Sequence, residues 1–373
     1  VGESLKVGDY TESAAETQKL IDSRPDIQRP MENLNRGAVA VRMDGYTYIS
    51  WRWLGTESAD TRYNIYRGSK EMSSYGQKLN TDPLNVTNFT DVFAADSNTQ
   101  YCIIPVVNGK EQADRAEFSQ TWDNNYMDIP IQKPENNKVN GEEYSYTPGD
   151  ASVGDLDGDG EYEIVLKWDP SNAKDAAQAG FTGECILDAY KLDGTKLWRI
   201  NLGRNIRSGS HYTQFMVYDF NNDGKAELVC KTADATVDGK GNVIGDKDAD
   251  YRNKDGFILE GPEYLTLFNG ETGEIMDTVD YDPPRGNVRE WGDSWGNRVD
   301  RFLACVAYLD GENPSVVMCR GYYDHGCPTV LVAYDVIDNK LVKRWKFLAN
   351  KDQNIEYTNQ GNHNLGVGDI DGD

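Results

Sequence analysis

The sequence predicts an all-β protein in which a β-propeller follows a small domain that resembles a β-sandwich. Two observations predict this fold class. From about residue 37, short runs alternate apolar and polar residues, with turn residues about every 8 to 12 positions, as in small sandwiches. Farther along, a motif that joins an acidic loop to a strand recurs 64 residues after its first copy, and hairpins with tight turns separate the copies.

The chain is strongly acidic. Its 373 residues include 62 Asp and Glu against 38 Lys and Arg, a formal net charge of −24. This charge would repel a nucleic acid, so we expect no nucleic-acid partner. The sequence has no run of the roughly 18 apolar residues that a membrane-spanning helix needs, and its first residues contain no basic-then-apolar signal segment. We therefore expect a soluble protein without a membrane partner, whose export signal has already been removed.

Changes in the residue pattern divide the chain into four parts. Residues 1–30 form a lead-in segment with one expected helix, Thr11 to Asp22, which begins with a capping-box spacing. Residues 31–125 carry the alternating runs of the small β-sandwich-like domain. The polar, proline-containing residues 126–144 are expected to be a linker, and the repeats occupy residues 145–373.

The repeat unit is a pair of strands joined by a loop and followed by a hairpin, which is the pattern of a four-stranded propeller blade. Full copies begin at Ser152 and Met216, a degenerate copy runs from Val306 to Arg320, and another begins at Leu365. Residues 145–373 have room for about four blades, whereas closed propellers have about 4–8. Because an open edge blade exposes unpaired backbone groups, we expect a later region or a second chain to complete the ring.

The acidic loops are predicted to bind calcium. In each loop, oxygen-bearing side chains occupy positions one, three and five, and a glutamate follows at position nine, a spacing that lets several oxygens converge on one ion. The alternative is that these Asp-Gly turns are merely solvated. Position seven of each loop and the acidic run near residue 370 are included in the prediction. The candidate metal positions in these loops are Asp155, Asp157, Asp159, Glu161, Glu163, Asp219, Asn221, Asp223, Lys225, Glu227, Asp369, Asp371 and Asp373.

The strand after each acidic loop ends in a basic residue. Lys167 and Lys231 occupy the same repeat position, and Arg320 matches them once one deletion is allowed. Because equivalent positions in a propeller share one radial orientation, these cations are expected to converge and to suit an anionic ligand such as a uronate. The alternative is that each base pairs with a nearby loop carboxylate.

Several strings are more specific than a generic calcium loop. They are Asp150–Gly160, Lys167–Asn172, Gly203–Arg207, His211–Phe215, Lys231–Asp234, Asp282–Gly286, Trp291–Ser294, Asn297–Leu303 and Gly361–Leu365. Together they resemble the bacterial rhamnogalacturonan lyases of polysaccharide lyase family eleven, from about residue 30 to the last residue. This match spans about the first three-fifths of the family's length.

This resemblance implies a secreted, eight-bladed propeller with several calcium ions that cleaves the pectic polysaccharide rhamnogalacturonan I, whose backbone alternates rhamnose and galacturonic acid. Asp169 matches a family position that contacts rhamnose, and His363 matches one that helps to hold a calcium ion in the active cleft. Gly149 stands where the family can have a sugar-binding Asn. We group Asp169, Gly149 and Arg320 as expected substrate contacts.

Elimination across the galacturonate C4–C5 bond sets the chemical requirements. The C6 carboxylate must be neutralised, a base must take the C5 proton, and the departing rhamnose oxygen must be protonated. Calcium, Lys or Arg can neutralise the carboxylate, and a base needs a suitably lowered pKa. Weak candidates for catalytic residues are Lys167, Lys231, Arg207, His211 and Tyr212. For the last three, the alternative is a packed polar turn between blades.

Two other functions stay open on the sequence. A calcium-braced propeller can serve only for carbohydrate binding or adhesion, because fold alone does not decide function. A glycosidase would use a pair of carboxylates, which cannot be singled out among so many acidic residues.

Overall fold

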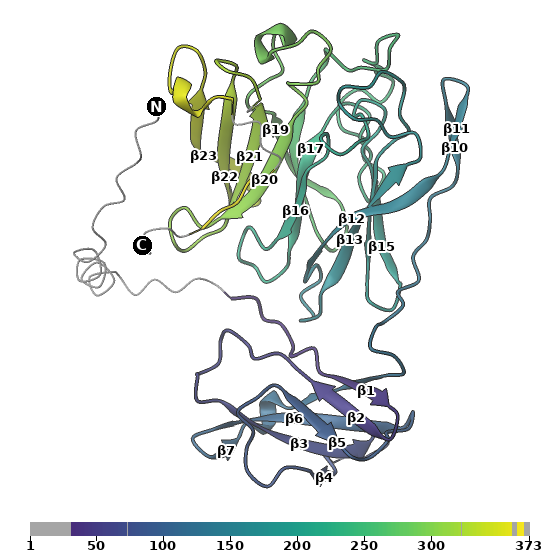
Figure 1. The fold of residues 1–373 in the computed structure, drawn as a ribbon, viewed down its shortest axis with the longest axis vertical. Helices are drawn as coiled ribbons and strands as arrows, with labels where there is room; N and C mark the ends of the chain where they lie inside the picture. The colour runs from purple at the N-terminus through teal and green to yellow at the C-terminus, as the bar shows by residue number, and fades with distance from the viewer. Residues whose placement is uncertain (1–30, 73, 322, 360–363, 369–373) are drawn as a thin grey trace, which may run out of the picture.

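The computed structural model describes residues 31–72, 74–321, 323–359 and 364–368, and these ranges form an all-β structure (Figure 1). Their helices are short 3-10 turns, η1 (Ala113–Arg115), η2 (Val288–Trp291) and η3 (Ile355–Tyr357). None of them is long and apolar enough to cross a membrane. The helix expected between Thr11 and Asp22 lies outside the described residues, as do the predicted metal ligands His363, Asp369, Asp371 and Asp373.

The N-terminal domain consists of two sheets that share one core. Ile49 of the first sheet and Ile65 and Ile103 of the second are fully buried in it. This is the packing that the alternating runs predict, because every second side chain of each strand faces inward. The first sheet has the order β5 (Asn88–Asp91), β2 (Tyr46–Ser50), β1 (Val39–Met43), β9 (Gln120–Trp122); the second has the order β4 (Gln77–Lys78), β3 (Arg62–Ser69), β6 (Thr99–Val107), β7 (Lys110–Glu111), with β8 (Glu117–Phe118) also paired to β6.

The stretch 126–144, which we expected to be a linker, ends in a hairpin. Its strands are β10 (Asn137–Val139) and β11 (Glu142–Tyr144), which pair with each other. Tyr144 is buried beside Tyr146, the first residue of the next sheet. The hairpin is therefore anchored by an aromatic contact that the polar composition of the stretch does not indicate.

Three four-stranded antiparallel sheets follow, each with its strands in sequence order. They correspond to the three repeat copies that precede residue 350. The strands are β12 (Tyr146–Gly154), β13 (Glu163–Pro170), β14 (Ile186–Tyr190) and β15 (Lys196–Asn201); β16 (Phe215–Tyr218), β17 (Glu227–Thr232), β18 (Tyr264–Phe268) and β19 (Ile275–Asp280); β20 (Phe302–Ala307), β21 (Ser315–Gly321), β22 (Thr329–Ile337) and β23 (Lys340–Ala349).

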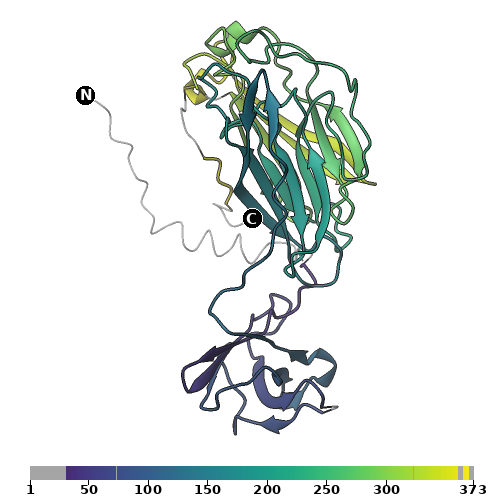
Figure 2. The same cartoon turned by 90° about the vertical axis from the view of Figure 1, so that its right-hand side faces the viewer.

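The middle sheet is packed on both faces. Leu228 and Cys230 of β17 belong to a core shared with the first sheet, and Val229 between them belongs to a core shared with the third. Every residue of β17 is buried. A strand buried on both faces reads as a continuous apolar run rather than an alternating one, which is how β17 appears in the sequence. Figure 2 shows the three sheets layered against one another.

All three sheets present the same two ends. The acidic loops 155–162 and 219–226 and the equivalent loop 308–314 connect the first two strands of each sheet at one end. The N-terminal domain lies at this end (Figure 1). Longer connections, 171–185, 233–263 and 281–301, gather at the opposite end. The acidic loops and the long loops are therefore separated by the length of the strands.

The first acidic loop contacts the N-terminal domain. Gly160 O accepts a hydrogen bond from the Asn35 backbone N–H at 2.8 Å, and Glu161 accepts from the side-chain amide of Asn35 at 3.3 Å. Tyr162 donates its hydroxyl to Glu32 at 2.7 Å and lies under the Arg52 guanidinium. The second acidic loop instead contacts the third sheet, through Asn222 and Asn313. The first loop thus holds the domain against the first sheet.

We expect Tyr162→Ala to loosen this junction, because it removes the hydrogen bond to Glu32 and the contact with Arg52. Small-angle X-ray scattering should record a larger radius of gyration. Lys225→Ala is the matched control, since it alters the equivalent loop of the second sheet, away from the domain. Equal radii for the two variants would contradict the assigned role of Tyr162.

Candidate active site and metal loops

The two acidic loops have the same geometry. In the first, carboxylate oxygens of Asp155, Asp157 and Asp159 lie within 4.8 Å of one another, and in the second those of Asp219, Asp223 and Glu227 do so. The position-nine glutamate is buried in both loops. In both it accepts the backbone N–H of the residue at position two, at 2.8 and 2.9 Å. The sequence repeat therefore corresponds to a repeat in the placement of oxygen atoms.

The oxygen-rich donor set fits a divalent cation such as calcium. Burial raises the pKa of Glu163 to about 7 and that of Glu227 to about 8, and the neighbouring aspartates add to both shifts. A bound cation would favour the ionised form of these carboxylates. In the first loop the Lys191 ammonium lies 2.5 Å from Asp157 and 2.9 Å from Asp159. Within the described ranges, no ion pair joins a Lys or Arg to Asp219, Asp223 or Glu227.

Two other predicted metal positions, Glu161 and Lys225, have side chains that are engaged outside their own loops, whereas Asn221 also bonds within its loop. Glu161 binds the N-terminal domain, as described above, and Lys225 pairs with Glu271 at 2.6 Å. The Asn221 amide donates to Asp223 at 2.9 Å. Because the side chains of Glu161 and Lys225 bond away from the carboxylates, a role of position seven in metal binding is limited to its backbone carbonyl.

The basic residues at the strand ends lie far from these loops. Along β13, Glu163 begins the strand and Lys167 stands four residues later, which is about 13 Å in an extended strand. Lys167 therefore lies toward the long loops and away from the first acidic loop. The carboxylates of the acidic loops and the cationic side chains at the strand ends occupy different regions of the molecule.

Lys167 lies in a small cluster of charges with Asp150 and Asp169. Its ammonium lies 2.5 Å from Asp150 Oδ2 and 4.0 Å from Asp169 Oδ1. The Lys167 side chain is 4% exposed, whereas that of Asp150 is 78% exposed. Burial is the largest single influence and opposes the charge of Lys167, but the hydrogen bond to Asp150 and the negative charges of Asp169 and Asp150 together outweigh it, so the pKa of the ammonium is raised. Lys167 is therefore a cation whose partner faces solvent.

Asp169 extends over Gly149. A Cβ atom at residue 149 would lie 2.2 Å from Asp169 Oδ2, so any larger residue there would displace the carboxylate. Burial raises the pKa of Asp169, Lys167 opposes the shift and Asp150 adds to it. The two expected substrate positions, Gly149 and Asp169, thus lie together. The absence of a side chain at Gly149 leaves the space that the Asp169 carboxylate occupies.

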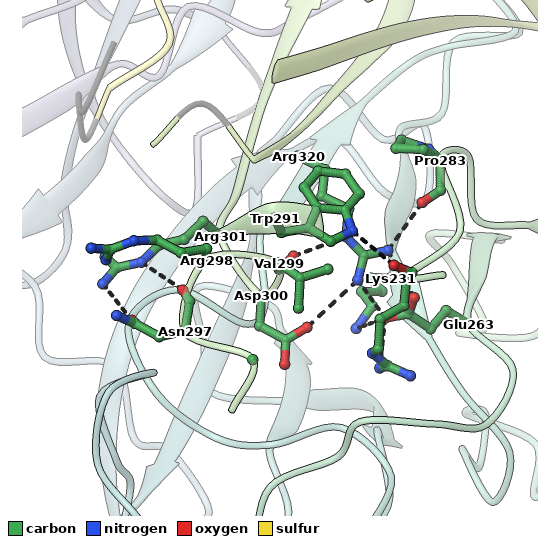
Figure 3. A network of polar contacts seen from close by, with 12 residues as sticks. Lys231, Glu263, Pro283, Trp291, Asn297, Arg298, Val299, Asp300, Arg301 and Arg320 are labelled. Atoms are coloured by element: carbon green, nitrogen blue, oxygen red, sulfur yellow. Dashed lines mark hydrogen bonds and ion pairs between the residues drawn. The ribbon is translucent and has the colours of Figure 1, made fainter. Parts of the chain in front are cut away.

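Lys231 and Arg320 converge on a buried carboxylate (Figure 3). The Lys231 ammonium lies 2.9 Å from Glu263, and the guanidinium groups of Arg285 and Arg320 lie 2.8 and 2.7 Å from it. Burial alone would raise the pKa of Glu263, but the three cations outweigh it and hold that pKa below its usual range. Arg320 also approaches Asp300 at 3.6 Å. Three cations and two carboxylates are therefore enclosed between the second and third sheets.

This cluster corrects the expectation that Arg320 contacts the substrate directly. Arg320 is 0% exposed, and Lys231 is 5% exposed with its ammonium over the Phe302 ring. The alternative, that each base pairs with a carboxylate, describes all three strand-end cations. The partners are not in the acidic metal loops, however. Glu263 precedes β18, and Asp150 lies on β12.

The predicted candidates Arg207, His211 and Tyr212 lie in the connection between the first and second sheets. Arg207 donates to the Tyr212 hydroxyl and to backbone carbonyls of the 171–185 loop. Arg301 approaches His211 Nε2 at 2.8 Å, and because a guanidinium can only donate, Nε2 is the acceptor. Arg207 and Tyr212 are each 3% exposed. Their packing is that of the alternative, a polar turn between sheets.

Sequence reasoning did not single out Asp150, Glu263, Arg285, Asp300 or Arg301 as site residues. Four of them fall within the family-specific strings, which was the available signal. Glu263 lies near the end of the long 233–263 loop, outside all of those strings. Its role follows only from the three cations that surround it in the folded chain.

Comparison with known proteins assigns the chain to a family. Residues 126–373 match the model of the C-terminal domain of rhamnogalacturonan lyase family 11, and residues 29–122 match the beta-sheet domain of rhamnogalacturonan I lyases. The chain therefore belongs to rhamnogalacturonan lyase family 11.

Two curated relatives come from Bacillus subtilis (strain 168). The chain is 55% identical over 346 residues to the rhamnogalacturonan endolyase YesW, covering 92% of this chain and 54% of the relative. It is 53% identical over 348 residues to the rhamnogalacturonan exolyase YesX, covering 93% and 55%. The chain thus spans about half the length of the curated relatives it matches.

Solved structures agree with this family. The crystal structure of YesX matches with a TM-score of 0.87 and 52% identity, over 94% of this chain and 56% of that one. The Bacillus licheniformis rhamnogalacturonan lyase PL11 matches with a TM-score of 0.87 and 55% identity, over 93% and 58%. The described fold is therefore shared with rhamnogalacturonan lyases over nearly the whole chain.

Replacing Glu263 by Gln should destabilise the protein strongly. Removing one partner of a buried ion pair typically costs about 3–5 kcal/mol, and here three cations would lose their shared anion. Urea denaturation measures the change. Asp300→Asn is the control, because Asp300 makes a single ion pair at 3.6 Å and should cost less. A smaller loss for Glu263→Gln than for Asp300→Asn would contradict the central role of Glu263.

Proposed function

We propose that this chain belongs to an enzyme that cleaves the rhamnogalacturonan backbone of pectin by β-elimination. Membership of the family and the similarity to the endolyase YesW and the exolyase YesX support the reaction class. The observation that links this reaction to particular residues is the buried ammonium of Lys167. It lies beside the carboxylates of Asp150 and Asp169, at the end of the sheets where the long loops gather. Because pectin is an extracellular polymer, we also propose that the protein acts outside the cell.

In the proposed mechanism Lys167 binds the galacturonate carboxylate. Its raised pKa keeps it protonated, so it serves as the anion-binding group and not as the base. Asp150 is exposed, and the substrate carboxylate can replace it as the partner of Lys167. This pairing acidifies the C5 proton and stabilises the enolate charge that develops as the proton leaves. A general base takes the C5 proton, the electron pair of the C5–H bond forms the C4–C5 double bond, the C4–O bond breaks, and the departing rhamnose oxygen takes up a proton.

Asp169 is proposed to position the neighbouring rhamnose. Its carboxylate lies 4.0 Å from Lys167 and is partly exposed, so it can accept hydrogen bonds from sugar hydroxyls next to the bound uronate. Gly149 offers no side chain for such a bond. In this chain the carboxylate of Asp169 therefore provides the contact on this side of the site.

We propose that the two acidic loops hold calcium ions. The ligands would come from Asp155, Asp157, Asp159 and Glu163 in the first loop and from Asp219, Asn221, Asp223 and Glu227 in the second. A bound calcium ion supplies positive charge to these crowded carboxylates. Because the loops lie at the end of the sheets opposite to Lys167, their residues brace the fold and do not touch the scissile bond.

The three sheets are proposed to be consecutive blades of a β-propeller. Each is four-stranded, its strands follow sequence order, and neighbouring sheets share a core. We propose that further blades, from a later region or a second chain, complete the ring.

Lys167→Met should lower kcat/KM for rhamnogalacturonan by about 100-fold or more, since loss of a preorganised group that stabilises oxyanion charge typically costs 10²–10³ in rate. The ultraviolet absorbance of the unsaturated uronate product measures the reaction. Lys196→Met, on β15 and outside the cluster, should leave the rate unchanged. Saturated reducing ends as the only product would indicate a hydrolase, and unaltered polymer would favour the binding-only alternative.

Chelation should lower the melting temperature, because an ion bound only by the folded state adds about 2.7 kcal/mol when its free concentration is 100 times its Kd. Without the ion, the raised pKa of Glu227 has a second effect. Between pH 4.5 and about 8 the unfolded chain releases this proton while the folded chain keeps it, so stability falls as pH rises.

The measurement is a series of melting temperatures from pH 4.5 to 8, with chelator and with excess calcium. Calcium should flatten the pH dependence and raise the curve, and Asp223→Asn should reduce its effect. Identical curves with chelator and with calcium would remove the proposal.

A further inference from the structure

A cavity of about 590 Å³ lies in the N-terminal domain, beside β9. Gln120 and Trp122 of β9 line it, together with Asn124 and Tyr126 of the segment that follows. Lys70 and Gln100, at the ends of β3 and β6, complete the wall from the other sheet. Its volume falls within the roughly 300–1,000 Å³ of small-molecule sites. The cavity is separate from the Lys167 cluster, since the N-terminal domain lies at the metal-loop end of the sheets.

The lining combines aromatic rings with amide groups. Tyr126 is 57% exposed and Trp122 is partly exposed. An aromatic ring offers an apolar face to the C–H groups of a sugar ring. The Gln120 amide already donates to Glu161 at 3.3 Å and accepts from the Trp122 indole at 3.4 Å. The amides of Gln100 and Asn124 can both donate to and accept from hydroxyl groups. This mixture suits a polyhydroxylated ring better than a purely apolar ligand.

The strand register extends the aromatic surface beyond the cavity. Trp122 is the register partner of Val41, and Val41 is the partner of Tyr48, so all three share the outer face of the first sheet. Tyr46, the partner of Met43, lies on the same face. Tyr46 and Tyr48 are 36% and 39% exposed, while Thr47 between them is fully buried. Large apolar groups that are exposed together on one face of a protein are typical of a binding surface.

The charges in the cavity select among sugars. Lys70 contributes one positive charge, and Asp123 and Asp128 contribute negative ones. Asp123 pairs with Arg42, which leaves the lining close to neutral. The whole chain carries −24, so a polyuronate gains no electrostatic attraction at this cavity. The negative charge of the chain does not repel an uncharged sugar.

We propose that this cavity and the adjoining aromatic face bind a neutral pyranose segment of a polysaccharide, as a second site remote from the Lys167 cluster. The inference rests on the proposed function in one respect, that the protein works on a polysaccharide. Trp122 and Tyr126 provide the stacking surfaces, and the amides of Gln100 and Asn124 bind hydroxyl groups. The site holds the polymer on the enzyme without taking part in the elimination.

The test is affinity electrophoresis of the full chain in gels that contain linear β-1,4-galactan. We expect the native protein to be retarded, and the double variant Trp122→Ala with Tyr126→Ala to bind at least about tenfold more weakly. The single variant Tyr126→Ala should show an intermediate loss of galactan binding. Because Tyr126 is exposed, this variant is expected to fold, so its loss of binding would not result from misfolding. Trp345→Ala is the matched control, because Trp345 is an exposed tryptophan (44%) on β23, in another sheet.

Retardation that is lost in the cavity variants and kept in Trp345→Ala supports the site. The inference is overturned if native protein migrates freely in galactan, if Tyr126→Ala and Trp345→Ala behave alike, or if galactan retards the double variant as strongly as the native protein. The lyase assay on the same samples separates the two proposals. If the protein binds galactan but forms no unsaturated product from rhamnogalacturonan, the result counts against the proposed function and still supports the second site.

Discussion

The structure depends on the burial of the middle sheet on both of its faces. Because β17 contributes alternate side chains to two cores, a base at its end has no solvent to reach. A buried ammonium must be paired, and Glu263 provides the negative charge, which it shares with the guanidinium groups of Arg285 and Arg320. The long loop before β18 is held in place by the same carboxylate. Packing of the sheets and the path of this loop are thus two results of one constraint.

The repeat places equivalent residues in different surroundings. Lys167 occupies in the first sheet the position that Lys231 occupies in the second, yet its partner Asp150 faces solvent. One lysine is therefore enclosed in a structural network, and the other is left where, in the mechanism we propose, a substrate carboxylate replaces its partner. The repeated sequence defines the position of the base, and the neighbouring elements decide whether it stabilises the fold or meets a ligand.

Much of the architecture follows from sequence patterns with short range. The spacing of the acidic loops and the hairpins between them predicted the four-stranded units, and the alternating runs predicted the N-terminal sheets. The hairpin at β10 and β11 was missed because its polar strands are anchored through two side chains, Tyr144 and Val139. Glu263 and the burial of Arg320 were missed because they depend on contacts across 57 residues. No local pattern encodes a contact of that kind.

The separation of the two ends of the strands has a consequence for how such a protein can change. Turns that gather oxygen atoms and dock the N-terminal domain occupy one rim, and the extended connections occupy the other. Insertions among those connections can reshape the proposed substrate site while the opposite rim keeps its folding signals. A new sugar preference can therefore arise at one rim without a matching loss of foldability at the other.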